Sequence, residues 1–307
     1  MVKAIGIKKK RRASRGERAL DITICAILFV LSLIFLYPLW QVIVASVSDP
    51  NVVMKKAGMI LFPEGWQVDS YKIVFDNRNI KSGFANTVLY MLAGTGFQYL
   101  ITLISGFSMS KKNAMLNKPL LFFMMFTMYF GGGLIPTYLL LNKIGLMNNW
   151  LVLILPHGVN VWNIIIMRTH MQSIPDSLSE AAYIDGANDA SILFKIIFPL
   201  SGAVSAVLIL FTAVSYWNMW FEPMIYLTER NKYPLQSILR EILINNDSNM
   251  LTGGLRNTQH IRQMKNQSFQ TLVKYANIVV STVPILVVYP FLQKYFIKGM
   301  LVGSLKG

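Results

Sequence analysis

Long uncharged apolar runs alternate with short polar segments along most of this chain. Six such runs, each 19 to 27 residues long, cover residues 22–48, 84–110, 119–141, 146–167, 200–221 and 275–293. About 20 consecutive apolar residues are enough for a helix to cross the hydrocarbon core of a bilayer. The pattern therefore predicts an all-α membrane protein with six transmembrane helices in one membrane domain, residues 22–297.

Composition and charge agree with this prediction. Of the 307 residues, 54% are hydrophobic and 14% are charged, whereas a soluble domain carries about 25% charged residues. The net charge is +15, but eight of the 29 basic residues lie in the first 18 positions, directly before an apolar run. Such a cluster favours a cytoplasmic anchor that meets anionic membrane lipid, and it argues against a nucleic-acid partner.

The basic tail, residues 1–21, also fixes the expected topology. The first run is too long for the 7–15-residue apolar region of a signal peptide, so we expect an uncleaved first span. Six spans place both termini on one side, and the tail makes that side cytoplasmic. Residues 170–199 are then a cytoplasmic loop and residues 228–274 an extracytoplasmic loop.

The polar segment between the fourth and fifth runs has strong helix signals. Ser173 and Asp176 are spaced to form a capping box at the start of a short helix. Gly186 stands where a glycine would end that helix. Asn188 or Asp189 can then cap a second helix.

The spacing within this segment resembles the EAA loop of permease subunits in binding-protein-dependent ABC importers. That pattern has Glu-Ala-Ala, three residues, Gly, nine residues, Ile, one residue, Leu and Pro. Here the corresponding residues are Glu180, Ala181, Ala182, Gly186, Ile196, Phe198 and Pro199. Phe198 in place of Leu is the one departure. The resemblance implies that this loop docks on an ATPase subunit through these positions and through Asp185.

Other stretches resemble the maltose-type (MalG-like) sugar permeases, from about residue 20 to the end. They are IPTYLLLNKIGLMNNW, LILP, QKYFIKGMLVGSLKG, FGGGLIPTY and YPLQSILREIL, of which the last two resemble an oligosaccharide and polysaccharide-fragment branch. The resemblance implies a type I ABC importer permease fold in the bacterial cytoplasmic membrane. It also implies a second homologous permease, two ATPase subunits that bind ATP and Mg, and an extracellular sugar-binding protein. The loop at 228–274 would meet that binding protein.

A path for a hydrated sugar needs polar and aromatic side chains inside the membrane. The candidate pathway residues are Asn160, Asn163, Trp217, Asn218, Trp220 and Glu222. We favour the cavity for Trp217 and Asn218, because an amide at membrane depth usually faces protein or water. For Trp220 we favour the aromatic belt at the membrane interface.

The sequence leaves the roles of two features undecided. Residues 131–133 are three glycines followed by Pro136, which is typical of either a bend beside the pathway or close helix packing. His157 lies inside a predicted span, where it has either a structural or a pathway role.

Nothing in the sequence predicts an enzyme. No P-loop motif is present, and the three histidines have no metal-ligand partners nearby in sequence, so we expect no cofactor or metal on this chain. The alternatives to a sugar permease are an ABC permease for another solute and an ion-coupled secondary transporter. The latter usually needs an ionisable group within a span, and here only His157 lies well inside one.

Overall fold

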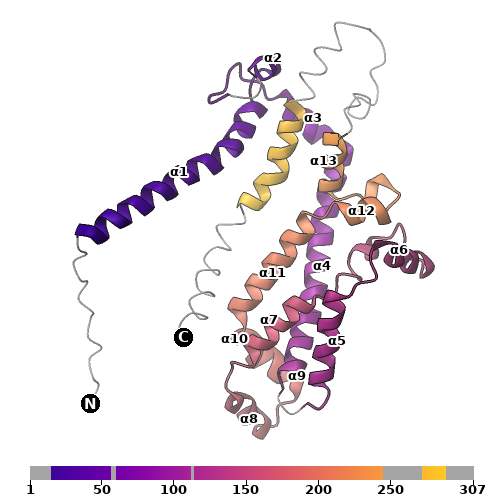
Figure 1. The fold of residues 1–307 in the computed structure, drawn as a ribbon. Coiled ribbons are helices and arrows are strands. Elements are labelled where there is room, and N and C mark those ends of the chain that lie inside the picture. The colour runs from indigo at the N-terminus through magenta and orange to yellow at the C-terminus, as the bar shows by residue number, and fades with distance from the viewer. Residues whose placement is uncertain (1–14, 57–59, 112–113, 245–271, 288–307) are drawn as a thin grey trace. The chain divides into compact units, whose positions relative to one another are not determined.

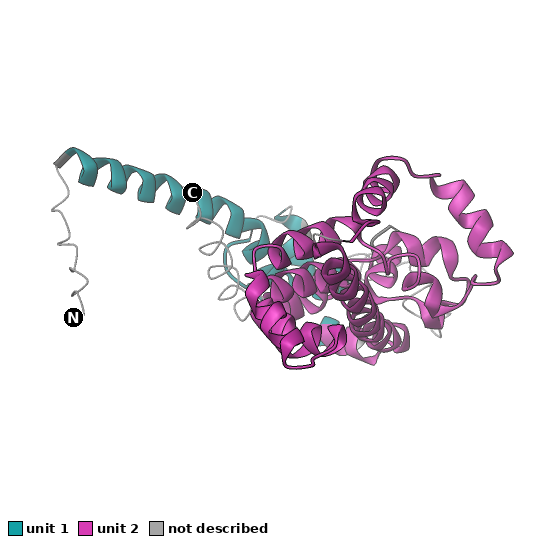
Figure 2. Ribbon diagram, turned by 90° about the horizontal axis from the view of Figure 1, so that it is seen from below, with its two compact units in different colours: residues 1–70, 260–276 teal, residues 71–259, 277–307 magenta. Residues whose placement is uncertain are grey.

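The computed structural model describes residues 15–56, 60–111, 114–244 and 272–287 of the chain. All regular elements in these ranges are helices (Figure 1), which confirms the all-α prediction for this part of the chain. The chain forms two compact units, residues 1–70 with 260–276 and residues 71–259 with 277–307 (Figure 2).

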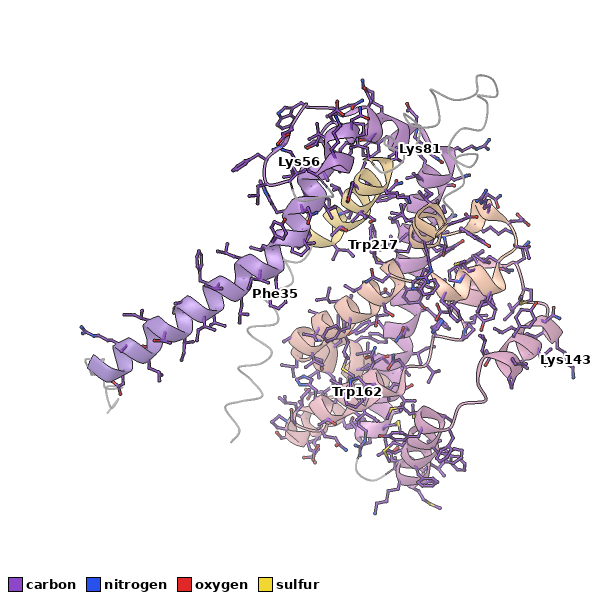
Figure 3. The ribbon with its side chains drawn as sticks, turned by 45° about the horizontal axis from the view of Figure 1, so that its top comes forward. Phe35, Lys56, Lys81, Lys143, Trp162 and Trp217 are labelled. Carbon is purple, nitrogen blue, oxygen red and sulfur yellow. The ribbon has the colours of Figure 1, made fainter. Side chains whose placement is uncertain are left out.

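The first unit is built around α1 (Arg15–Ser46), which contains most of the first predicted span. No residue of its most apolar stretch is buried, and Phe35, 73% exposed, projects from the helix (Figure 3). A helix that is apolar on all sides is typical of a membrane span. At its C-terminal end, Val44 and Ala45 pack in a small core that includes Val53, from α2 (Pro50–Lys55). The predicted tail continues into α1, and its first 14 residues lie outside the described part.

The second unit is organised around one long helix, α4 (Arg78–Ser110), which contains the second predicted span. Asn77 caps α4, because its side chain accepts hydrogen bonds from two backbone N–H groups of the first turn. Three helices pack against α4 (Figure 1): α7 (Val161–Met171), α11 (Gly202–Trp217) and α13 (Leu235–Ile244). The shorter elements are α3 (Asp69–Asp76), η1 (Trp150–Leu153), α8 (Asp176–Ile184), α9 (Asp189–Ile192), η2 (Leu193–Ile197), α10 (Phe198–Leu200), α12 (Phe221–Tyr226) and η3 (Arg230–Lys232).

Glycines on α4 allow these neighbours to approach closely. A Cβ at Gly94 would lie 2.2 Å from Cζ of Tyr216 on α11. A Cβ at Gly106 would lie 2.7 Å from Cγ of Met167 on α7. Small residues are common at such contacts between membrane helices because they bring the backbones together.

The third predicted span is two helices and not one. α5 (Asn117–Tyr129) and α6 (Leu134–Lys143) meet at an angle of 110°. The break lies at the three glycines, and Gly133 has φ = +83°, a conformation that favours glycine. A Cβ at Gly131 or Gly133 would find no atom within 4 Å among the described residues. The glycines therefore form a bend here, and among the described residues they do not mediate close packing.

The fourth predicted span, 146–167, is also interrupted. A 3₁₀ turn (η1) and further turns precede α7, which begins only at Val161. Pro156 has no N–H to continue a helix, and the side chain of Asn160 caps the new helix by accepting from the N–H of Asn163 at 3.0 Å. The prediction of one continuous helix was wrong for this segment.

The last two predicted spans are partly covered. α11 contains most of the fifth, and its junction with the preceding helices 189–200 bends by 85°. The sixth begins in an apolar helix, Leu272–Val287, and its remaining residues lie outside the described part. Among the described residues, two helices are long and apolar enough to cross a membrane, or up to four if each bent pair is one span.

Candidate functional site

The EAA-like segment forms the short helix α8, but it starts differently from the prediction. Pro175 occupies the N-cap position of α8, and its side chain makes no capping hydrogen bond. The hydroxyl of Ser173 instead donates to the carbonyl of His170, at 2.7 Å, at the end of the preceding helix. The helix therefore begins after Pro175 and not after Ser173, whose hydroxyl donates to the end of α7.

The end of α8 follows the prediction for Gly186, which has φ = +80°. Its N–H donates to the carbonyl of Tyr183 at 3.0 Å, and the N–H of Ala187 donates to the carbonyl of Ala182 at 2.9 Å. This pair of bonds is a Schellman motif, in which a left-handed residue closes the helix. Gly186 is thus confirmed as the residue that ends α8.

The two alanines of α8 face different environments. Ala182 is buried in a core formed with Met167 and Met171 of α7, together with residues from α4, α9, η2 and α11. Ala181 is exposed, as are Glu180 and Asp185. Exposed apolar side chains lie on the same helix, with Leu178 43% and Ile184 86% exposed. One side of α8 is therefore fixed to the bundle while another carries apolar and acidic side chains without a covering element among the described residues.

The second helix of the segment also begins as predicted. The side chain of Asn188 accepts from the N–H of Ser191 at 2.8 Å and caps α9. The helix then widens into the π-helical turn η2, where the N–H of Phe198 bonds the carbonyl of Leu193. Pro199 cannot donate in the following turn. Ile196 packs against the same core as Ala182, whereas Pro199 is exposed near the bend into α11.

A polar contact that the sequence did not predict connects this segment to the end of α4. Lys111 Nζ lies 2.6 Å from Asp189 Oδ1 and 3.1 Å from the Tyr183 hydroxyl. Tyr183 in turn donates to Asp189. Hydrogen bonds from Lys111 and Tyr183 lower the pKa of Asp189. For Lys111, burial by itself would lower the pKa, but the bonds to Asp189 and Tyr183 outweigh it and the pKa is raised. This Lys111–Asp189–Tyr183 cluster therefore holds α8 and α9 against α4 with both charges present at neutral pH.

We expect Asp189→Asn to weaken transport about two- to fivefold, because an exposed ion pair contributes less than about 1 kcal/mol. A carboxyl with a lowered pKa stabilises the folded state above its unfolded pKa and loses this effect as pH falls through the folded value. The wild type should thus lose the cluster only in acid, whereas Asp189→Asn lacks it at neutral pH. Initial rates of sugar uptake by cells at neutral pH would measure the loss of transport. The exchange of Lys111→Asp with Asp189→Lys should restore transport, and an additive loss in the double variant would contradict the role of the pair.

A cavity of about 610 Å³ lies between α4, the turns before α7, and the end of α11. Its lining consists of Gln98, Pro156, His157, Val159, Asn160, Asn163, Phe211, Thr212, Ser215, Tyr216, Asn218, Met219, Trp220, Phe221 and Glu222. Amide, hydroxyl and aromatic groups therefore face one space, which is the combination that sugar hydroxyls and ring faces require.

Two of the lining residues are buried without a protein partner for their polar atoms. The side-chain amide of Gln98, a residue 5% exposed, makes no hydrogen bond within the described part of the chain. The hydroxyl of Tyr216, on a side chain 3% exposed, has none there either. A buried polar group without a partner costs about 1–3 kcal/mol, so these groups are suited to a ligand. The signal for Gln98 was present in the sequence, as an amide within the second apolar run.

The three predicted asparagines line the cavity and also hold its walls. Asn163 Nδ2 donates to Thr212 Oγ1 at 3.2 Å and joins α7 to α11. Asn218 Nδ2 donates to the carbonyl of Val214 at 3.0 Å. Asn160 uses its carbonyl oxygen as the cap of α7, and its NH₂ group makes no hydrogen bond to the described residues. Each wall amide is thus oriented by the fold.

Of the two tryptophans, Trp220 lines this cavity and Trp217 does not. Trp217 is 5% exposed and is not one of the residues that line the cavity. It packs edge-on against Phe84, with 5.8 Å between ring centroids, and its Nε1–H donates to the carbonyl of Ser281 at 3.2 Å. Trp220, by contrast, lies in the lining. Trp220 reaches the lining because α11 ends at Asn218, where the chain turns and brings the following residues to the cavity.

His157 was left open by the sequence, and the structure places it in the cavity wall. Its ring is edge-on to Tyr216, with 6.4 Å between centroids. Glu222 also lies in the wall, as predicted. The structure therefore brings five of the six predicted pathway residues together and adds Gln98, His157 and Tyr216 to them.

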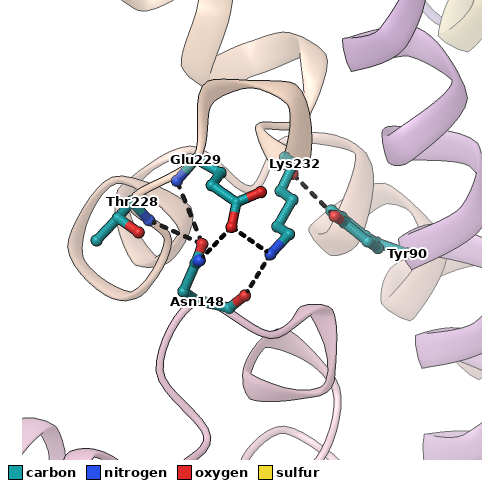
Figure 4. A network of polar contacts seen from close by, with 5 residues as sticks. All are labelled: Tyr90, Asn148, Thr228, Glu229 and Lys232. Carbon is teal, nitrogen blue, oxygen red and sulfur yellow. Dashed lines mark hydrogen bonds and ion pairs between the residues drawn. The ribbon is translucent and has the colours of Figure 1, made fainter.

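Near η3, a polar network centred on Asn148 joins two loops to α4 (Figure 4). Asn148 has φ = +56°, and its Oδ1 accepts from the N–H groups of Thr228 and Glu229, both at 3.2 Å. Its Nδ2 donates to Glu229 Oε1 at 2.6 Å, and its carbonyl accepts from Lys232 Nζ at 2.8 Å. The Tyr90 hydroxyl of α4 donates to the Lys232 carbonyl at 2.8 Å. Hydrogen bonds from Lys232 and Asn148 lower the pKa of Glu229, so the network stays ionised at neutral pH.

Comparison with known proteins shows that this chain is similar to components of transport systems. Residues 98–302 match the family described as binding-protein-dependent transport system inner membrane component, and this range contains the whole cavity lining and the EAA-like segment. The chain is 37% identical over 291 residues to the polygalacturonan/rhamnogalacturonan transport system permease protein YtcP of Bacillus subtilis (strain 168), covering 95% of this chain and 99% of that protein.

Two further relatives extend over nearly the whole chain. Protein LplC of Bacillus subtilis (strain 168) is 35% identical, and the match covers 96% of this chain and 97% of LplC. The crystal structure of a bacterial ABC transporter involved in the import of the acidic polysaccharide alginate contains a chain with 30% identity and a TM-score of 0.83. That match covers 94% of this chain and 100% of the other.

Proposed function

Because the chain belongs to the family of binding-protein-dependent transport system inner membrane components, we propose that it is a permease subunit of an ATP-driven importer of oligosaccharides. The observation that carries this proposal is the cavity, in whose wall the Tyr216 hydroxyl is buried without a partner among the described residues. The side-chain amide of Gln98, a residue 5% exposed, also lines this cavity and makes no hydrogen bond to the described residues. A sugar supplies hydroxyls that can bond both groups. The residues proposed for the pathway are these two with Asn160, Asn163, Asn218, Trp220 and Glu222.

The proposed topology has six spans with both termini in the cytoplasm. The apolar helices α1 and α4, the two bent pairs and the helix Leu272–Val287 support it. The interrupted segment before α7 would lie inside the protein, beside the cavity that Pro156 and Asn160 line. Irregular backbone at membrane depth is tolerated only in such a setting.

The exposed side of α8 is proposed as the docking surface for an ATPase subunit. Two ATPases would bind ATP and Mg, while this chain would bind neither. The proposal rests on the EAA-like spacing and on the exposure of Glu180, Ala181 and Asp185 beside Ile184. The buried Ala182 and the Lys111–Asp189–Tyr183 cluster would make α8 a rigid lever.

The other partners are a second, homologous permease and an extracellular sugar-binding protein. We assign the contact with the binding protein to the loop at 228–274, whose residues 245–271 lie outside the described part. The Asn148 network would hold the start of this loop, through Glu229 and Lys232, against α4 (Figure 4).

Transport would follow from the geometry in three steps. The binding protein delivers sugar to the cavity when it is open to the outside, and the wall amides and Trp220 hold it. Closure of the ATPases moves α8, and the cluster transmits this movement to α4, which carries Gln98 of the cavity wall. Nucleotide binding drives the change because it stabilises one of the two states more than the other. A permease for another solute and an ion-coupled transporter are less consistent with the family and the relatives.

For the substrate class, we propose oligosaccharides that contain uronic acids. YtcP is described as a polygalacturonan/rhamnogalacturonan permease, and the similar solved transporter imports the acidic polysaccharide alginate. Purification of the tagged chain in mild detergent should recover a second permease and an ATPase, and the reconstituted complex should take up such sugars with ATP. Recovery of the chain without an ATPase, even after crosslinking from α8, would overturn the assignment.

We expect Gln98→Leu to raise the KM for sugar uptake about three- to tenfold, because one neutral hydrogen bond to the substrate is lost. The side chains are similar in size, so assembly should be unchanged. Thr102→Val is the matched control. Thr102 lies one turn further along α4, is buried with no partner among the described residues, and does not line the cavity. A normal KM for Gln98→Leu, or an equal change in Thr102→Val, would show that Gln98 does not contact the sugar.

A further inference from the structure

A guanidinium group stacks on one of the residues that line the cavity. Arg240, on α13, stacks on the indole of Trp220, with Cζ 3.4 Å from the ring centroid. Trp220 lines the cavity, and its carbonyl accepts from the Ser237 hydroxyl of α13 at 3.0 Å. The hydrogen bond and the stacking together fix α13 and Arg240 relative to this part of the wall.

Arg240 differs from its neighbour Arg230 in its partners. Arg230 forms an ion pair with Glu241, so its charge is neutralised locally. Arg240 is exposed and has no acidic partner among the described residues; its contact is the Trp220 ring. Stacking uses the face of a guanidinium and leaves the N–H groups of its edge free. Those N–H groups fit a carboxylate bidentately.

The cavity wall itself carries no cation. Among the described residues, its lining contains one carboxylate, Glu222, and no lysine or arginine. A neutral sugar would find its hydrogen-bonding groups there, but for a sugar carboxylate the lining offers no compensating lysine or arginine, and Glu222 would repel it. Arg240 supplies the positive charge that the lining lacks, at the side of Trp220.

We infer that Arg240 and Trp220 form a subsite for the carboxylate of a uronic acid residue in the transported oligosaccharide. The guanidinium edge binds the carboxylate, and stacking on the indole keeps the guanidinium oriented. This inference rests on the proposed function and deepens it, since it names the residue that distinguishes acidic from neutral sugars. The sequence named Trp220 among the candidate pathway residues but favoured the membrane interface for it, and it gave Arg240 no role in binding sugar.

The test compares two sugars in cells that carry substitutions in the chromosomal gene, so that all native partners are present. The probes are radiolabelled trigalacturonate and the neutral trimer obtained by reducing its carboxyl groups to alcohols. Arg240→Gln should raise the KM for trigalacturonate at least about tenfold, the effect of losing a charged hydrogen bond, and change uptake of the neutral trimer less than twofold. Arg240→Lys should fall between these values, because it keeps the charge and loses the bidentate geometry. Arg230→Gln removes the same charge from the paired arginine and should leave the KM for trigalacturonate unchanged.

Three results would overturn the subsite. Trigalacturonate uptake could be normal in Arg240→Gln, or acidic and neutral sugars could be affected equally, which would make Arg240 only a support for Trp220. An equal effect of Arg230→Gln would point to general surface charge. If the wild-type complex assembles and hydrolyses ATP but takes up neither trimer, and no other uronate oligosaccharide, the proposed function fails together with the inference.

Discussion

Gly186→Pro should abolish transport while the chain still inserts in the membrane. Gly186 has φ = +80° and its N–H bonds the carbonyl of Tyr183. Proline is restricted to φ near −65° and has no N–H, so it can adopt neither feature, at a cost of about 3 kcal/mol or more. The end of α8 must then rearrange, and with it the exposed residues proposed to dock on the ATPase. Uptake by cells, together with the amount of chain in the membrane fraction, measures both parts of the prediction.

Two further variants make this result specific. Gly186→Asn should transport nearly as well as the wild type, because asparagine tolerates the left-handed conformation and retains the N–H. Glu180→Lys should abolish transport without any backbone change, because it reverses a charge on the exposed side of α8. Normal transport by either Gly186→Pro or Glu180→Lys would show that α8 is not the lever.

Gly94→Ala should be the most damaging small substitution in the bundle. Its Cβ would lie 2.2 Å from Cζ of Tyr216 and within 2.7 Å of two other atoms of the same ring. Tyr216 is 3% exposed and lines the cavity, so the ring cannot move without disturbing the α4–α11 contact or the cavity wall. Overpacking of this kind costs about 1–3 kcal/mol. We expect a lower thermal unfolding midpoint of the purified complex and uptake reduced at least about fivefold, the factor that 1 kcal/mol represents.

The matched control for this prediction lies two residues away on the same helix. A Cβ at Gly96 would meet no atom within 4 Å among the described residues. Because alanine is about 0.5–1 kcal/mol better than glycine inside a helix, Gly96→Ala should be neutral or slightly stabilising. If both variants behave alike, the close approach of Tyr216 to α4 is not important for the cavity.

The EAA-like segment was the part best predicted from sequence. Gly186 and Asn188 were assigned their positions correctly, because helix ends depend on local hydrogen bonds between neighbours in the chain. The N-cap lies at Pro175 and not at the predicted Ser173 for a related reason. The signal was real, but the end of α7 offered the hydroxyl another acceptor, the carbonyl of His170. Local signals therefore predict helix ends well until two elements compete for one group.

The cavity shows the limit of the sequence more clearly. Asn160, Asn163 and Asn218 were recognised because an amide within an apolar run is costly and therefore informative. The sequence favoured the cavity for Trp217 and the membrane interface for Trp220, and this choice was uncertain because an indole fits a core, a membrane interface or a binding site equally well. The end of α11 at Asn218 decided between them by turning Trp220 into the cavity wall.

By itself, the sequence determined that this is a helical membrane permease, since long apolar runs, a basic tail and the EAA-like spacing are all readable along the chain. The tertiary structure decided which helices bend, which face of α8 is free, and which side chains meet. Lys111 with Asp189, and Arg240 with Trp220, are separated by 78 and 20 residues along the chain. No periodic pattern relates such residues, because their contacts depend on how closely the packed helices approach one another, as at Gly94 and Gly106.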